Sequence, residues 1–282
     1  MQTISRRIFL RSGGGAIAAA RALELGADPL GLPLGCQTYP VRKAIGKDFP
    51  GTLAQLRGIG FQRIEMCSPS GYATAGFGPL ANQKPSELRQ TIHDQGLGCE
   101  SCHFGFRELK ENLDDRITFA KELGLKQMVL ASFGLRKDAA MGDWMRAADE
   151  LNKIGERIQK AGFQLGYHNH DSEFHLINGV LVYDKLMSEF DPKLVKMQFQ
   201  VSVISLGYDA ATFMTKYPGR FISLHLQDWS NTEKKIVPIG RGSVDWKKLF
   251  TAAKKGGVRN YFVEMSLDDM KASVPYLHHL KV

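Results

Sequence analysis

The sequence predicts one closed barrel of eight parallel strands, each followed by a helix. The first observation behind this prediction is a recurring unit, in which a helical stretch ends at Gly or Pro and a short apolar run follows. The second is the number of runs, because eight such alternating units favour a closed barrel over an open sheet. The third is that no G-x-G-x-x-G motif follows an early strand, which disfavours a dinucleotide-binding fold.

Composition sets the broad class. The 282 residues are 43% hydrophobic and 23% charged, which is ordinary for a globular protein with one large core. No apolar run approaches the roughly 18–20 residues of a membrane span, so stable membrane insertion is not expected. The formal net charge of +8 comes without a long Lys/Arg block, so no nucleic-acid partner is expected. Formation of a homo-oligomer is left open.

Residues 1–30 are predicted to be an export leader. Ser5 to Arg11 reads S-R-R-I-F-L-R, a twin-arginine pattern, and the small, apolar stretch Gly13 to Ala20 follows it. Ala20-Arg21-Ala22 has the A-x-A form of a cleavage site. We therefore expect export to the periplasm by the twin-arginine route, and a cytoplasmic location if the leader is not functional. Residues 31–282 then form the barrel, a single catalytic domain.

The first four strand–helix units follow in order. The first strand is expected from Leu32 to Tyr39. Glycines after helical stretches supply the left-handed cap that turns the chain back, and they stand at Gly60, Gly96 and Gly124. The apolar runs after them predict strands at 61–65, 97–99 and 127–130.

The last four units repeat the pattern. Their helical stretches stop at Gly162, at Pro192, at Pro218-Gly219 and at Gly257. The strands that follow are expected to begin at Leu165 and to cover 195–199, 221–224 and 261–263.

The fifth strand carries the most titratable chemistry. His168 and His170 are two residues apart, so on a strand both side chains project to one face, and Asp171 and Glu173 follow. Buried titratable groups need a partner or a ligand. Either histidine alone fits a structural role equally well, but the pair followed by carboxylates favours a functional site.

Other strand ends add to this site, because the chemistry of such a barrel gathers where its strands end. Histidines and glutamates converging there indicate a divalent-metal and proton-transfer site. The residues with polar or titratable groups at strand ends are Gln37, Tyr39, Glu65, His103, His168, His170, Gln200, His225 with Asp228 nearby, and Glu264.

Four short motifs resemble the sugar phosphate isomerase/epimerase family of xylose isomerase-like TIM barrels. They are H-N-H-D-S-E-F at 168–174, H-L-Q-D at 225–228, P-I-G-R-G-S-V-D-W at 238–246 and Y-F-V-E at 261–264. The resemblance runs from about Leu32 to the C-terminus. It implies a single (β/α)8 TIM barrel that acts on a small-molecule carbohydrate. The implied activity is a metal-dependent sugar or keto-sugar isomerase or epimerase that moves a proton beside a carbonyl through a metal-stabilised enediolate.

The resemblance also implies a ligand set. The family holds its metal with Glu, Asp, His and Glu from strands five to eight, which places the ligands at His168, Gln200, His225 and Glu264. His168 stands where many relatives have Glu, Gln200 where they have Asp, and Gln227 where a Lys is common. Glutamine can coordinate through its amide oxygen. Two imidazoles favour Mn, Co, Zn or Fe over Mg.

The same positions suggest the catalytic groups. Facing carboxylates move the proton in the family's isomerases, and here His168 replaces one of them. The proton relay is therefore expected to use Glu264 with an imidazole or with Glu65. Glu65, His103 and His170 are predicted to face the substrate, and Glu264 is predicted to act both as ligand and as base.

Alternative functions remain open. One is a related keto-sugar lyase or hydratase, and another is a non-catalytic sugar-binding barrel in which Gln200 marks a degraded metal site. An apurinic-site nuclease shares the barrel but is disfavoured, because its three-metal site needs more His and Asp ligands at strand ends.

Several residues near the site have structural interpretations. Glu173 and Phe174 fit a cap for the next helix as well as a substrate role. Asp245 is expected to cap a helix, with Trp246 packing behind it. Trp144 and Trp229 are candidates for sugar stacking, with Trp229 favoured. A buried, non-zinc role is expected for the four cysteines, Cys36, Cys67, Cys99 and Cys102.

Overall fold

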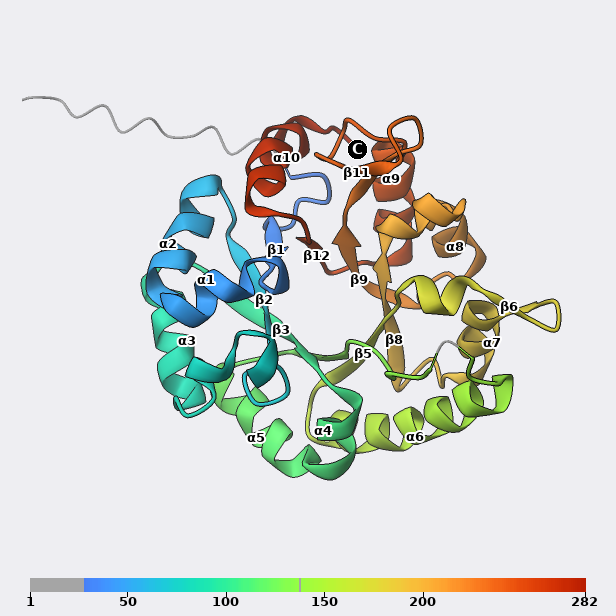
Figure 1. Ribbon diagram of the computed structural model, residues 1–282, viewed down its shortest axis with the longest axis horizontal. Coiled ribbons are helices and arrows are strands. Elements are labelled where there is room, and N and C mark those ends of the chain that lie inside the picture. Colours follow the sequence, from blue (N-terminus) through green and yellow to red (C-terminus); the bar gives the residue numbers. More distant parts are fainter. Residues whose placement is uncertain (1–27, 137) are drawn as a thin grey trace, which may run out of the picture.

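A computed structural model describes residues 28–136 and 138–282, so the predicted twin-arginine motif and cleavage site lie outside the described residues. Parallel strands form a closed barrel in the order β1-β12-β9-β8-β5-β4-β3-β2, which confirms the predicted fold class (Figure 1). The barrel strands are β1 (Gly35–Gln37), β2 (Arg63–Cys67), β3 (Gly98–Phe104), β4 (Gln127–Leu130), β5 (Gln164–His168), β8 (Val195–Gln200), β9 (Phe221–Leu226) and β12 (Asn260–Val263).

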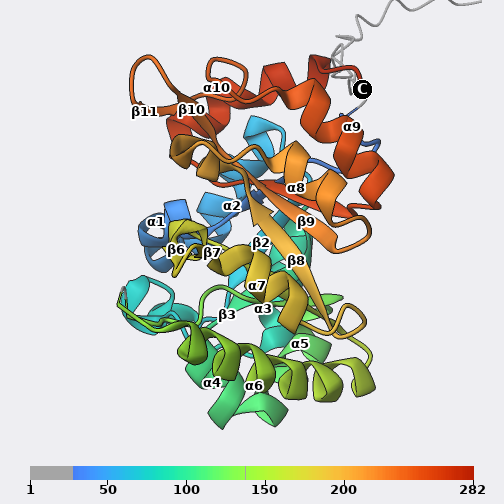
Figure 2. The same cartoon turned by 90° about the vertical axis from the view of Figure 1, so that its right-hand side faces the viewer.

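Helices surround the barrel, as the two perpendicular views show (Figures 1 and 2). They are α1 (Arg42–Lys47), α2 (Phe49–Ile59), α3 (Pro85–Asp94), α4 (Phe106–Glu111), α5 (Leu113–Leu123), α6 (Met141–Lys160), α7 (Val182–Glu189), α8 (Ala210–Lys216), α9 (Trp246–Gly256) and α10 (Leu267–His279). Among the described residues, none of these helices has the length and apolar character that a membrane crossing requires.

The helices pack on the sheet through apolar stripes. In α9 the buried residues Trp246, Leu249, Phe250 and Ala253 recur at the three- and four-residue spacing of one helix face. The predicted glycine stops are also present: α5 ends at Gly124 (φ 86°) and α9 ends at Gly257 (φ 76°), both in the left-handed region.

Short elements outside the barrel were not predicted. Two-stranded hairpins form from β6 (Leu176–Ile177) with β7 (Val180–Leu181), and from β10 (Asp228–Ser230) with β11 (Lys235–Val237). Short 3-10 helices include η4 (Asp171–Phe174) after β5 and η5 (Val201–Leu206) after β8. Strands of two or three residues are too short to give a periodic pattern, so the sequence carries no clear signal for them.

Candidate active site

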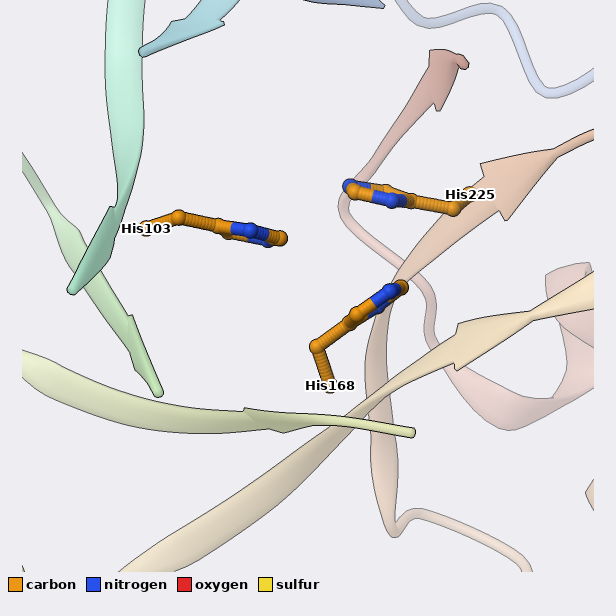
Figure 3. Close-up of side chains that lie close together, drawn as sticks. All are labelled: His103, His168 and His225. Atoms are coloured by element: carbon orange, nitrogen blue, oxygen red, sulfur yellow. The ribbon is translucent and has the colours of Figure 1, made fainter. Parts of the chain in front are cut away.

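Three histidines from three strands meet inside the barrel. His103 on β3, His168 on β5 and His225 on β9 are all buried, and one nitrogen from each ring lies within 4.8 Å of the others (Figure 3). The rings of His168 and His225 have their centroids 4.3 Å apart, and those of His103 and His225 are stacked at 5.0 Å. Imidazole nitrogens at this spacing can bind a divalent metal ion.

Glu65 on β2 holds this cluster from inside the barrel. Its side chain is fully buried, and one carboxylate oxygen lies 2.5 Å from Nε2 of His225 and 3.2 Å from Nε2 of His103. That oxygen also accepts a hydrogen bond of 2.8 Å from Gln37. The other oxygen accepts from Ser101 (2.5 Å) and from Nε2 of Gln198 (2.8 Å). Glu65 is therefore saturated by protein groups and orients histidines, as the carboxylate partner of a metal-binding histidine does.

Gln198 fixes the ring of His103. Its amide nitrogen must face Glu65, because a carboxylate can only accept, so its amide oxygen faces Nε2 of His103 at 2.6 Å. Nε2 of His103 consequently carries the proton. The strand register shifts next to both polar residues, between Ile64 and Glu65 and between Met197 and Gln198. Such irregularities re-aim side chains and are common beside active sites.

Glu264 lies at the outer edge of the cluster, just after β12. Its Oε2 accepts from Nδ1 of His225 at 2.9 Å and from Nε2 of Gln200 at 2.7 Å. Its side chain is 18% exposed, whereas Glu65 is 0% exposed. Among the described residues, Oε1 of Glu264 has no hydrogen-bond partner. This free oxygen makes Glu264 the glutamate of the cluster that is open to a substrate.

Gln200 turns its nitrogen, not its oxygen, toward Glu264. The amide oxygen instead faces the backbone N–H of Ser202 at 3.4 Å. Coordination of a metal through this oxygen beside Glu264 would therefore require rotation of the amide group.

The charges of the cluster depend on one another. Burial alone would lower the pKa of His225, but Glu264 and Glu65 raise it to about 9. Burial alone would raise the pKa of both glutamates, but the histidines lower it, and the pKa of Glu65 falls well below its ordinary value. Burial and the neighbouring histidines hold the pKa of His168 well below its ordinary value. His168 is thus a neutral imidazole, the form that coordinates metals.

Two consecutive residues at the end of β5 carry buried polar atoms without partners. Within residues 28–136 and 138–282, neither Nδ1 of His168 nor Nδ2 of Asn169 has a hydrogen-bond partner. Leaving such atoms unpaired costs free energy, so they mark a position where a ligand would be held. A divalent metal fits the donor set of two imidazoles, one carboxylate and one amide once His225 gives up its Nδ1 proton and the amide of Gln200 rotates.

The loop after β5 is held by Glu173. Its buried carboxylate accepts from Tyr167, from the backbone N–H of His170 (2.8 Å) and from Ser172 (2.9 Å). These contacts favour a structural role for Glu173 over a substrate role. Phe174 packs in an aromatic cluster, with its ring centroid 4.7 Å from that of Tyr183.

The loop after β9 is held by Asp228. Its carboxylate is fully buried and accepts from the backbone N–H groups of Trp229, Gly240, Gly242 and Val244 and from the indole of Trp246. A Cβ on Gly242 would lie 2.0 Å from Oδ1 of Asp228, so glycine is required there. Asp245 caps α9 through a 2.9 Å bond from the N–H of Lys248, as predicted.

The predicted site residues thus fall into two groups. His103, His168, Gln200, His225 and Glu264 come together, whereas Glu65 lies fully buried behind the histidines and His170 lies exposed at the mouth, its ring centroid 4.7 Å from that of His168. The four cysteines are free thiols, three of them buried. Sequence reasoning missed Ser101, Gln198 and Ser223, which surround Glu65 or contact Gln198. Each lies two residues before a strand-end residue of the site, so the two-residue strand period would have placed them on its face.

Comparisons with known proteins agree with the fold. The sequence pattern of the family described as xylose isomerase-like TIM barrel matches residues 53–273. The inosose dehydratase of Geobacillus thermodenitrificans is 25% identical over 262 residues, which cover 77% of this chain and 87% of that protein.

Solved structures share the fold. A sugar phosphate isomerase/epimerase from Parabacteroides distasonis superimposes with a TM-score of 0.77 at 23% identity, covering 94% of this chain and 98% of its own. A xylose isomerase-like TIM barrel protein from Mycobacterium smegmatis in complex with magnesium gives a TM-score of 0.65 at 14% identity, covering 88% and 95%.

Proposed function

Because the chain belongs to the xylose isomerase-like TIM barrel family, we propose that it is a metal-dependent enzyme that enolises a keto-sugar. In this reaction the enzyme removes a proton from the carbon beside the substrate's carbonyl group. The observation that carries the proposal is the free carboxylate oxygen of Glu264, which lies at the exposed edge of the buried histidine cluster.

His168, His225, Glu264 and Gln200 are the residues that would hold the metal. His168 offers an unpaired Nδ1, and Nδ1 of His225 and Oε2 of Glu264 already lie 2.9 Å apart. His103, whose ring adjoins both histidines, is the alternative third imidazole. A bound divalent ion would supply positive charge beside the carbonyl oxygen, where negative charge develops during proton removal.

Glu264 acts as the base. Its Oε1 accepts the proton, the electrons of the broken C–H bond form a carbon–carbon double bond, and the carbonyl electrons move to oxygen. His225 keeps this carboxylate ionised, since it lowers the pKa of Glu264. Glu65 is a positioning residue that holds the rings of His225 and His103.

We favour completion of the reaction by loss of water, as in a lyase, over completion by epimerisation. An epimerase needs a second proton-transfer group on the opposite face of the carbon, and Glu65 is fully buried with both oxygens occupied. A lyase needs only that the hydroxyl on the next carbon leave as water, with the newly protonated Glu264 supplying the proton. The likeness to an inosose dehydratase supports this completion and an inosose or keto-sugar as substrate.

Product analysis tests the proposal. The manganese-loaded protein is incubated with an inosose and with a panel of ketohexoses, and products are followed by NMR and mass spectrometry. We expect a product lighter than the substrate by one water. An epimer of unchanged mass would identify an epimerase instead. No conversion of any keto compound by the metal-loaded protein would refute the proposed activity.

A further inference from the structure

The net positive charge of the chain comes from one stretch, residues 193–260. This stretch holds twelve Lys and Arg residues against four Asp and Glu residues, an excess equal to the formal net charge of +8 of the whole chain. The remaining residues together carry no net charge. A one-sided charge of this kind determines what the protein attracts rather than how it folds.

Helix α9 carries the densest part of this charge. Its buried residues face the barrel, while its exposed face consists of Thr251 and the lysines Lys247, Lys248, Lys254 and Lys255. On a helix surface, an acidic and a basic residue four positions apart stabilise the helix, whereas like charges repel. Because α9 contains no acidic residue, its lysines repel one another without that compensation.

Two of these lysines stand at the end of the helix where positive charge is unfavourable. Lys247 and Lys248 lie in the first turn of α9, after the cap residue Asp245. The macrodipole of a helix favours negative charge at this end. Lys248 is paired with Asp209 at 2.6 Å, but Lys247 forms no ion pair among the described residues. Helix stability therefore does not explain Lys247, whose charge is available to an external anion.

A groove between α8 and α9 adjoins the lysines. The two helices lie side by side on the outside of the barrel (Figures 1 and 2). The groove has a volume of about 470 Å³, and Lys247, Lys248 and Lys255 line it together with small residues of both helices. The carboxylate of Asp245, which also lines it, accepts from the backbone N–H of Lys248 as the helix cap. The groove therefore has space for an anionic group beside its lysines.

The β10–β11 hairpin extends the basic surface. A backbone N–H of its turn donates to Oγ of Ser243 at 3.0 Å, which ties the hairpin to the loop that leads into α9. The hairpin presents Ile236, which is 44% exposed, two residues after the exposed Lys234. Lys235, between them, is paired with Glu233. An apolar side chain next to lysine is the combination with which peripheral segments rest in the membrane interface.

The composition of this surface favours a lipid membrane over other anionic partners. Protein interfaces are enriched in aromatic residues and Arg and depleted in Lys, yet α9 exposes only lysines and Thr251. Single-stranded nucleic acids stack on aromatic side chains, and the exposed face of α9 has none. Lysine acts as a point charge on a flexible stem, which suits a diffuse layer of headgroup charges.

We propose that α9 and the β10–β11 hairpin place the protein on a membrane surface with anionic phospholipid headgroups. The contact is peripheral: the lysines meet headgroup phosphates, and Ile236 enters the interface. Each lysine held close to such a surface strengthens binding by about fivefold, so Lys247, Lys254 and Lys255 together suffice for a measurable interaction. This inference does not depend on the proposed catalytic function.

Sedimentation with lipid vesicles tests the inference. The full chain is mixed with vesicles of phosphatidylcholine alone and with vesicles that contain about one-third phosphatidylglycerol, whose headgroup is anionic. We expect binding only to the anionic vesicles. Raising NaCl from about 0.05 M to about 0.5 M should release the protein, because salt screens the attraction. In every protein compared, the leader carries glutamine in place of its arginines, Arg6, Arg7, Arg11 and Arg21, so that it adds no positive charge of its own.

Variants assign the binding to α9 and the hairpin. The combined change Lys247→Gln, Lys254→Gln and Lys255→Gln should weaken binding to anionic vesicles at least about tenfold. Ile236→Ser should weaken it several-fold, because an apolar side chain no longer enters the interface.

The matched control changes Lys43, Lys121 and Lys160 to glutamine. It removes the same charge from exposed lysines of other helices and should alter binding by less than about threefold. Thermal melting checks that each variant is folded.

Absence of binding to anionic vesicles at low salt would overturn the inference. So would parental binding by the α9 variant, or an equal loss in the control, since that loss would show that only total charge matters. Parental binding by Ile236→Ser would refute the part assigned to the hairpin. Poly-glutamate that displaces the vesicles at equal charge would identify an acidic protein segment as the partner instead.

Discussion

Glu264 and Gln200 differ in how firmly their roles are defined by their contacts. Glu264 combines a bound oxygen, which contacts His225 and Gln200, with a free one that is open to the mouth. Gln200 presents its nitrogen to Glu264, so its predicted role as a ligand depends on rotation of the amide. The family has Asp at this position, according to the resemblance, and that acid would add a negative charge next to Glu264.

Metal titration of two variants tests these roles. Glu264→Gln should weaken binding of Mn or Co by about 10–100-fold and abolish turnover, because it removes the only anionic ligand and the base. Gln200→Asp should strengthen metal binding, because it restores a negative charge. Isothermal calorimetry on protein first stripped with EDTA measures both. Glu264→Gln with parental metal affinity would place the site elsewhere, and an unchanged affinity in Gln200→Asp would show that position 200 is not a ligand.

The contacts of Asp228 lead to a prediction about stability. Asn at this position would present an N–H to backbone and indole donors that now share one carboxylate, leaving several without an acceptor. We expect Asp228→Asn to lower the free energy of unfolding by about 2–4 kcal/mol, measured by urea denaturation. Asp245→Asn is the control, because asparagine caps a helix as well as aspartate does. Equal stability of the two variants would argue against Asp228 as the residue that holds this loop.

At the scale of elements, the strand–helix repeat was predictable and the small hairpins were not. The predicted strand at 127–130 coincides with β4, because a glycine cap precedes it and its buried run is uninterrupted. The apolar run that indicated the third strand stops at Cys99, because Glu100 and Ser101 interrupt it, although His103 was placed at that strand's end; β3 runs from Gly98 to Phe104. Ser101 is inward-facing because it bonds Glu65, a long-range contact that no local pattern indicates.

Asp209 lies where the start of α8 meets α9, and its charge and its cap can be tested separately. Asp209 caps α8 at the N–H of Ala211 (3.2 Å) and pairs with Lys248 of α9 at 2.6 Å. Burial alone would raise the pKa of Asp209, but Lys248 is among the groups that lower it. A carboxyl whose pKa is lowered in the folded state contributes stability above its unfolded pKa, about 3.9, and loses it as pH falls through the folded value.

Asp209→Asn should therefore be less stable than the parent at pH 7 by a few tenths of a kcal/mol, because the cap remains and only the exposed ion pair is lost. That difference should begin to shrink as the pH falls below about 4 and should vanish below the folded pKa of Asp209. Asp209→Ala should cost about 1 kcal/mol in addition, since it also removes the cap. Urea denaturation between pH 3 and 7 measures all three proteins. A stability difference for Asp209→Asn that is independent of pH would contradict the assigned role of the charge.

For the whole molecule, the sequence indicated which residues gather at the site better than it indicated the hydrogen bonds between them. The ends of parallel strands meet at one face of a barrel, so His103, His168, His225 and Glu264 could be grouped from strand order alone. The saturation of Glu65 could not, because it depends on which way each amide and imidazole points. Trp229 was the favoured aromatic for sugar stacking, and that role stays a prediction.

Export of the whole chain remains a prediction from the twin-arginine pattern at Ser5 to Arg11. Changing Arg6 and Arg7 together to lysine should trap the protein in the cytoplasm, because the pattern depends on both arginines. Fractionation of cells that express the parent and the variant measures this. An identical distribution of the two proteins would contradict the prediction.

The central claim is that the histidine cluster and Glu264 remove a proton beside a carbonyl group. Deuterium exchange tests it most directly, because isomerases, epimerases and dehydratases of this type share that step. An inosose or keto-sugar is incubated in D₂O with the manganese-loaded protein, and proton NMR follows the signal of the carbon beside the carbonyl. We predict that deuterium replaces this proton in the substrate, or that the proton is lost as water leaves and deuterium enters at the neighbouring carbon when the enol product ketonises. The exchange should stop when EDTA removes the metal and in Glu264→Gln. Retention of the proton by the metal-loaded parent, or exchange at the same rate in Glu264→Gln, would contradict the claim.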